Sequence, residues 1–200
     1  MEIWLVRHTR PAVEPGTCYG WTDVPLADSF EQEAELIRSF LPNLASGNQL
    51  WCSPLSRCTR LASFAYVDLL PTYQPDLREM HFGEWENRHW NTIPEEDSKH
   101  WMDHFVEVAT PGGESYVQLQ ERVWRCLEPV FKEDHHRPLV VISHGGVMRC
   151  LLATLMGVPL VASFEQFKLD YGAVVRLNRE GALGWQAAFI HQAQWIREGE

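Results

Sequence analysis

The sequence predicts an α/β protein: a three-layer α/β/α sandwich with a mostly parallel central sheet and an aromatic-rich cap insertion. Short apolar runs alternate along the chain with stretches of helical character, an order typical of parallel strands covered by helices on both faces. The alternation stops over about residues 79–112, where aromatic rings crowd the sequence, which indicates an insertion over one end of the sheet. Because the 200 residues hold no repeat, low-complexity tract or linker, we expect a single domain over 1–200.

Six apolar segments predict the strands of this sheet. The runs Ile-Trp-Leu-Val and Leu-Val-Val-Ile do not alternate with polar residues, as expected for strands buried on both faces. The last two segments predict an antiparallel hairpin at the edge of the sheet, with its turn at Glu180 and Gly181. The predicted strands cover residues 3–6, 49–52, 73–77, 139–142, 173–177 and 184–190.

Capping residues and prolines delimit the helices between these strands. After a loop over residues 11–28, Asp28 or Ser29 is placed to cap the first helix, which ends before a proline at position 42. Ser53 fits the cap of the second helix, with Pro54 in its first turn. The helices are predicted from residue 29 to 40 or 41, over 55–67, from the break at 112–115 to 132, and from the turn at 143–146 to 155.

The composition argues against nucleic acid or an anionic membrane as a partner, because the net charge is −10. A basic pocket in this acidic chain remains compatible with a small anionic ligand. Five cysteines without a paired C-x-x-C spacing favour reduced thiols. We find no signal sequence, and the best apolar run, 145–160, is too short to span a membrane and holds Arg149. We therefore expect a cytoplasmic protein, and the oligomeric state stays open.

Three predicted strands end in residues that suit phosphate binding. Arg7 and His8 follow the first strand, Arg57 lies in the first turn after the second, and His144 precedes two glycines at a helix start. In isolation each has an ordinary explanation, as surface arginine or core histidine. Ligands of open α/β sheets bind beyond the carboxyl ends of the strands, so these groups are expected to converge. Guanidiniums, imidazoles and exposed amides together would bind a dianion such as phosphate.

Five sequence blocks resemble the signature of the histidine phosphatase superfamily, in its phosphoglycerate-mutase-like branch. They occur in the family's order between residues 5 and 146, and they read LVRHTRP, WCSPLSRCTRLA, LREMHFGEWE, PGGES and VISHGG. The resemblance implies the α/β fold predicted above and a phosphomonoester hydrolase that works through a phosphohistidine. It implies no metal and no cofactor, and its partner is a small phosphate monoester.

The resemblance also assigns the residues of the phosphate pocket. His8 is the implied nucleophile, and a neutral imidazole is competent for that role near pH 7. Arg7, Arg57 and His144 are implied to hold the phosphoryl oxygens, with help from the Gly145 amide.

A carboxyl group is implied as the acid that protonates the leaving oxygen. The family places a glutamate three residues before its Phe-Gly pair, which is Glu79 in this chain. Glu84 and Glu86 match the spacing less well and are kept as rival candidates. Glu114 and Ser115 of the PGGES block are interpreted as supports that orient the pocket, or alternatively as the first turn of a helix.

The aromatic-rich segment holds one departure from the family pattern and two open interpretations. Asn87 stands where glycine is usual, and asparagine tolerates a left-handed backbone best among non-glycine residues, so we expect the turn to survive. The rings either stack on a flat heterocycle or form a small core under the insertion. His89, His100 and His104 have irregular spacing, which favours surface histidines over a metal site.

Two neighbouring blocks are similar to the α-ribazole phosphatases of cobalamin nucleotide-loop assembly. They are WLVRHTRP and CYGWTDVPL, and by family position Tyr19 and Gly20 border the substrate. The predicted substrate is therefore α-ribazole 5′-phosphate or adenosylcobalamin 5′-phosphate. The alternatives are a broad-specificity or sugar-phosphate phosphatase, a phosphoglycerate mutase, and, in a different class, a non-catalytic module that binds phosphorylated ligands.

Overall fold

A six-stranded sheet forms the centre of the computed structural model, which describes residues 1–45, 49–132, 137–179 and 184–192. The strand order is β3-β2-β4-β1-β5-β6. Strand β4 pairs in parallel with β1 and β2, β2 pairs in parallel with β3, and β5 is antiparallel to both β1 and β6. The mostly parallel sheet and its antiparallel edge hairpin are as predicted, while the turn at 180–181 lies outside the described residues. The strands are β1 (Glu2–Arg7), β2 (Leu50–Cys52), β3 (Thr72–Tyr73), β4 (Leu139–Ser143), β5 (Val174–Arg179) and β6 (Trp185–His191).

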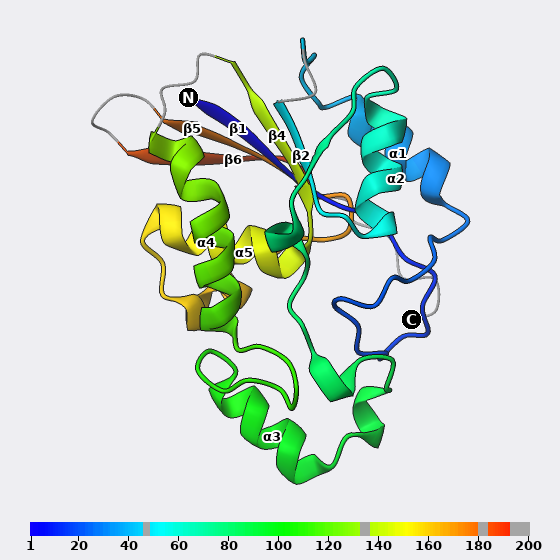
Figure 1. Cartoon of the computed structure of the whole chain (residues 1–200), viewed down its shortest axis with the longest axis vertical. Helices are drawn as coiled ribbons and strands as arrows, with labels where there is room; N and C mark the ends of the chain where they lie inside the picture. Colours follow the sequence, from blue (N-terminus) through cyan, green and yellow to red (C-terminus); the bar gives the residue numbers. More distant parts are fainter. Residues whose placement is uncertain (46–48, 133–136, 180–183, 193–200) are drawn as a thin grey trace.

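Helices cover both faces of the sheet, which confirms the predicted sandwich (Figure 1). They are α1 (Phe30–Arg38), α2 (Ser56–Ala65), α4 (Tyr116–Lys132) and α5 (Gly145–Met156). Side chains of β1 alternate between the two layers, as a strand geometry requires. Ile3 and Leu5 pack in the core formed with α4 and α5, whereas Trp4 and Val6 pack with α1 and α2. The first strand is thus buried on both faces. No helix among the described residues is both long and apolar enough to cross a membrane.

The aromatic-rich segment lies at one end of the molecule, away from the sheet, and contains a helix that the sequence analysis did not predict (Figure 1). This helix, α3 (Glu95–His104), follows Pro94 and carries three acidic residues in its first turn, which suit the positive end of a helix dipole. It buries little of its surface, so the apolar period that reveals an amphipathic helix is weak. The remaining short elements are η2 (Pro75–Leu77), η3 (Gly83–Trp85), η4 (Trp90–Thr92), η5 (Leu160–Ala162) and α6 (Ser163–Gln166).

Two predicted boundaries are wrong for local reasons. Of the strand expected over 73–77 only Tyr73 belongs to β3, because Pro75 lacks the N–H that a ladder needs and starts a 3₁₀ turn instead. Helix α2 begins at Ser56 with Leu55 as its cap residue, so Ser53 is not the cap. The hydroxyl of Ser53 is instead bonded to a histidine across the sheet.

A small core supports the cap. Cys18, Trp85 and Ile93 are buried there, and three further aromatic side chains pack against them. Asn87 has a φ of 63°, the left-handed value expected for this position, and its N–H donates to the Cys18 carbonyl at 2.8 Å. The N–H of Cys18 in turn donates to the carbonyl of Arg88 at 2.8 Å. These bonds tie the loop between β1 and α1 to the cap.

Candidate active site

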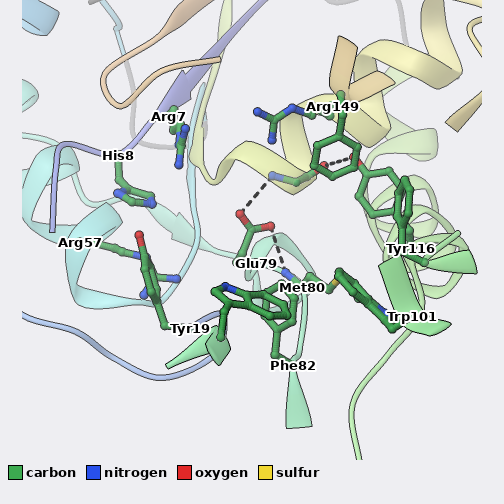
Figure 2. Close-up of a pocket in the computed structure, with 14 residues that line it drawn as sticks. Arg7, His8, Tyr19, Arg57, Glu79, Met80, Phe82, Trp101, Tyr116 and Arg149 are labelled. Carbon is green, nitrogen blue, oxygen red and sulfur yellow. Dashed lines mark hydrogen bonds between the residues drawn. The ribbon is translucent and has the colours of Figure 1, made fainter. Parts of the chain in front are cut away.

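A cavity of about 320 Å³ lies beyond the carboxyl ends of β1 and β4. Its polar wall includes Arg7, His8, Arg57, Glu79 and Arg149, which Figure 2 shows around one common space. The other wall is apolar and consists mainly of aromatic side chains. Five predicted residues, which come from four blocks of the sequence, therefore line one cavity together with Arg149, which was not predicted; the five are Arg7, His8, Tyr19, Arg57 and Glu79.

His8 follows β1 directly and is buried. Its Nδ1 lies 2.6 Å from the carbonyl oxygen of Thr9. Because a carbonyl oxygen only accepts, Nδ1 carries the proton and Nε2 keeps its lone pair. Burial lowers the pKa of His8 well below 6.5, and the positive charges of Arg57 and Arg7 lower this pKa further, against a smaller opposite effect of the Thr9 bond. The imidazole is thus neutral at pH 7, with a nucleophilic nitrogen.

Two guanidiniums from different elements flank His8. Arg7, the last residue of β1, donates from Nη1 to the Leu169 carbonyl and stacks 4.1 Å from the ring of Tyr171. Its buried Nε has no partner among the described residues. Arg57, in the first turn of α2, is fully buried and donates to the Gly20 carbonyl at 2.6 Å. Both cations are held from behind and line the cavity.

His144 stands between β4 and α5 and is fully buried. Arg57 Nε donates to its Nδ1 at 3.3 Å, and since a guanidinium only donates, the proton of His144 is on Nε2. That nitrogen donates to Ser53 Oγ at 2.8 Å. Burial lowers the pKa of His144 well below 6.5, and the charge of Arg57 adds to this effect. The His8 and His144 rings meet edge to face with centroids 5.1 Å apart.

The Glu79 carboxylate is fixed by two backbone amides (Figure 2). Oε1 accepts from the Met80 N–H and Oε2 accepts from the Gly146 N–H, both at 3.0 Å. A Cβ at position 146 would lie 2.3 Å from Glu79 Oε1, so glycine is required for this approach. Gly145, whose amide was predicted to help hold the phosphoryl group, lies next to the Arg7 guanidinium, which a Cβ there would approach to 3.3 Å. Gly146 was overlooked, although the second glycine of the VISHGG block was the available signal.

The backbone that carries Glu79 is held by a buried ion pair. Arg122 donates from Nη2 to the Glu79 carbonyl at 2.7 Å and from Nη1 to the Arg78 carbonyl at 2.9 Å. The same guanidinium binds Glu114 through Nη2 at 2.6 Å and Nε at 3.0 Å. Glu114 therefore acts on the pocket through Arg122, without lining the cavity.

Ser115 lies at the start of α4 rather than at the cavity. Its hydroxyl accepts from the Gln118 N–H at 3.3 Å, and the Gln118 side chain accepts from the Ser115 N–H at 2.8 Å. This reciprocal pair is a capping box. The geometry favours the helix-start interpretation of Ser115.

The two rival carboxylates lie outside the cavity wall. Glu86 accepts from the backbone N–H groups of Trp21, Thr22 and Phe82. Burial opposes ionisation of Glu86, but these bonds outweigh it, so that the pKa is lowered from its usual value. Glu86 thus anchors the loop before α1, and Glu84 is exposed.

Tyr19 lines the cavity and is joined to a residue that the sequence analysis missed. Its hydroxyl lies 2.6 Å from the hydroxyl of Tyr171. The Tyr19 ring faces the Arg57 guanidinium at 5.5 Å. Each tyrosine of the pair therefore makes a cation–π contact with one arginine, Tyr19 with Arg57 and Tyr171 with Arg7. Gly20 does not line the cavity; it bonds Arg57 through its carbonyl and lets the Met80 carbonyl approach where a Cβ would collide at 1.8 Å.

The aromatic segment forms the small core expected under the insertion, and part of it also lines the cavity. Phe82, Trp90 and Trp101 pack against the buried cap core, and all three also line the cavity. The wall is completed by Phe105 and by Phe164 from α6. No group of three or more His, Cys, Asp or Glu side chains in the described ranges is placed to hold a metal ion.

Comparison with known proteins agrees with the fold. The model of the histidine phosphatase superfamily (branch 1) matches residues 3–189, and the chain therefore belongs to this superfamily. It is a histidine phosphatase, a class of enzyme. The superfamily and the enzyme class predicted from the sequence blocks are confirmed.

Several relatives are α-ribazole phosphatases. The adenosylcobalamin/alpha-ribazole phosphatase of Escherichia coli (strain K12) is 29% identical over 190 residues, which cover 91% of this chain and 93% of the relative. The crystal structure of the alpha-ribazole phosphatase from Shigella flexneri superposes with a TM-score of 0.85 at 25% identity, covering 96% of this chain and 98% of that one. TTHB049 from Thermus thermophilus is 35% identical, with a TM-score of 0.68, and covers 89% and 94% of the two chains.

Proposed function

We propose that this enzyme hydrolyses phosphomonoesters through a phosphohistidine on His8 and that its substrate is α-ribazole 5′-phosphate or adenosylcobalamin 5′-phosphate. The role that follows is in cobalamin nucleotide-loop assembly. The observation that carries the proposal is the neutral His8, whose Nε2 lone pair lies in a cavity lined by Arg7 and Arg57.

In the first step His8 Nε2 attacks the phosphorus and the bond to the alcohol oxygen breaks. The charge on the phosphoryl oxygens is stabilised by Arg7 and Arg57, because pre-oriented guanidiniums in a buried site need little reorganisation. His144 does not line the cavity, and it acts on the phosphoryl group by positioning Arg57, whose Nε donates to its Nδ1. The protonated Glu79 gives its proton to the leaving oxygen, so the alcohol departs neutral.

In the second step water hydrolyses the phosphohistidine. The Glu79 carboxylate takes one proton from the water as its oxygen attacks the phosphorus. The N–P bond then breaks, and His8 recovers its lone pair while inorganic phosphate is released. Bonds from Met80 and Gly146 hold the carboxylate in one position for both proton transfers.

The choice of substrate rests on the apolar wall and on the relatives. Trp90, Trp101 and Phe82 offer ring faces and edges that suit a flat aromatic base on the alcohol side of the ester. Relatives named as adenosylcobalamin/alpha-ribazole phosphatases cover about nine-tenths of the chain. A sugar phosphate or a phosphoglycerate would leave this wall unused.

A phosphate-release panel tests the substrate. It compares kcat/KM for α-ribazole 5′-phosphate, sugar phosphates, 3-phosphoglycerate and a phosphohistidine peptide. We expect α-ribazole 5′-phosphate to exceed the others by at least tenfold; equal values would favour a broad-specificity phosphatase. Isomerised 3-phosphoglycerate without release of phosphate would indicate a mutase, and binding without any reaction would indicate a phospholigand-binding module.

The variant His8→Ala tests the intermediate. We expect it to release no phosphate and to give no acid-labile phosphoprotein after rapid quenching, whereas the wild type gives both. His100→Ala removes an exposed histidine of the cap and serves as the matched control. Phosphate release by His8→Ala at the wild-type rate would overturn the phosphohistidine mechanism.

A further inference from the structure

We infer that Arg149 forms a second anion-binding subsite, which recognises a carboxylate on the alcohol part of a phosphomonoester. The inference rests on the proposed function, because it leaves the reacting phosphoryl group to His8, Arg7 and Arg57. It goes beyond the proposed substrate, since the alcohol part of α-ribazole 5′-phosphate carries no anionic group. The enzyme's range would then include carboxylated phosphomonoesters.

The position of Arg149 follows from helix α5. Arg149 lies one turn after Gly145, on the face of the helix that meets the cavity, and Figure 2 shows its guanidinium beside that of Arg7. A Cβ at Gly145 would lie 3.2 Å from Arg149 Nη1 and 3.3 Å from Arg7 Cζ. The two cations are therefore neighbours next to Gly145.

Two contacts on the side away from the cavity fix the Arg149 guanidinium. Its Nε donates to the Phe167 carbonyl at 3.1 Å, and its Cζ lies 4.8 Å from the Phe164 ring centroid. These contacts use one N–H and one face of the group. The terminal Nη donors have no bond to other described residues and line the cavity.

The charge of Arg149 has no ion-pair partner within the described residues. A guanidinium in a partly dehydrated wall costs free energy unless an anion compensates it. Burial and the nearby charge of Arg7 lower the pKa of Arg149, which reflects the same unfavourable setting. An anionic ligand relieves both effects.

The charge balance of the cavity points to a monoanion. A phosphoryl dianion offsets the charges of Arg7 and Arg57, and the Glu79 carboxylate is bonded to the Met80 and Gly146 amides rather than to Arg149. The positive charge of Arg149 remains, and a carboxylate would compensate it in full. A guanidinium also offers parallel N–H donors that match the two oxygens of a carboxylate.

The test uses two esters that differ only in the terminal group, 3-(phosphonooxy)propanoate and 3-hydroxypropyl phosphate. We expect the wild type to prefer the carboxylate in kcat/KM by about 10- to 100-fold, as for a hydrogen bond to a charged group. Arg149→Met should abolish this preference, because kcat/KM should fall about 10- to 100-fold further for the carboxylate than for 3-hydroxypropyl phosphate. Arg149→Lys should keep part of the preference, because it keeps the charge and loses the paired donors.

Equal kcat/KM for the two esters in the wild type overturns the subsite. So does an equal loss for both esters in Arg149→Met, which would mean a purely structural role. If the wild type releases no phosphate from any ester, the proposed function fails instead, and calorimetric Kd values for the same pair still decide the subsite.

Discussion

The variant Gly146→Ala tests whether Glu79 acts as the acid. A methyl group at this position would lie 2.3 Å from Glu79 Oε1, and Cβ atoms do not approach other atoms closer than 3.0 Å, so the carboxylate must retreat. The retreat also strains the 3.0 Å bond from the Gly146 N–H to Oε2. A displacement approaching one ångström at a reacting group costs on the order of 10²-fold in rate. We therefore expect kcat/KM for an alkyl phosphate to fall by about 10²-fold.

The assay separates proton donation from phosphate binding by the choice of leaving group. An alkoxide needs a proton to depart, whereas 4-nitrophenolate leaves without one, so 4-nitrophenyl phosphate should lose less than about tenfold. Stability should not fall by much, because alanine is favoured over glycine within a helix by about 0.5–1 kcal/mol, which offsets part of the steric cost. Thermal unfolding of both proteins checks this.

Gly145→Ala is the matched control on the neighbouring residue. Its Cβ would press on Arg7 and Arg149 rather than on Glu79, so both substrates should lose activity to a similar extent. The reasoning is refuted if Gly146→Ala also affects the two substrates equally, or if it leaves the alkyl phosphate unaffected.

Three further outcomes are expected. As the pH falls, kcat/KM should decline only well below pH 6.5, because only neutral His8 attacks and burial lowers its pKa. A decline on the acid side with its midpoint at pH 6.5 or above contradicts this. Arg122→Met should lower the free energy of unfolding in urea by about 3 kcal/mol, because the largely buried Glu114 carboxylate loses its cation and three backbone carbonyls lose their donor. Arg125→Met on the same helix breaks only an exposed 3.9 Å contact and should change it by less than about 1 kcal/mol. Tyr19→Phe and Tyr171→Phe remove the same 2.6 Å bond, so their effects on vanadate affinity should not add in the double variant; additive losses would mean that the tyrosines act separately.

The sheet could be predicted because its strands are short, apolar and separated by residues that cap helices. Helix α3 could not, since it buries too little surface to leave a clear period. The cap assignment of Ser53 failed for a related reason. The Ser-Pro pattern is locally suited to a helix start, but a hydrogen bond to His144, distant in sequence, fixes the hydroxyl instead.

The candidate site likewise contains residues that local sequence predicts and residues that only tertiary packing brings in. Arg7, His8 and Arg57 lie at or near strand ends, and the carboxyl ends of parallel strands meet at one edge, so their convergence followed from the fold class. Arg149 and Tyr171 lie on a helix and a loop whose orientation depends on tertiary packing. For Arg149 the available signal was its helical spacing, one turn after Gly145, whereas no spacing in the sequence connects Tyr171 to the site.

The position of Trp101 links the shape of the cavity to the folding of the cap. Its ring packs against the buried core of the cap on one side and lines the cavity on the other. Enlarging the cavity at this residue would remove packing that the cap needs to stay folded. Phe164 is 44% exposed and lies outside that core, so it can change size at a much lower cost in stability. Substitutions that change substrate preference among relatives should therefore accumulate first around α6, while Trp90 and Trp101 of the apolar wall are retained.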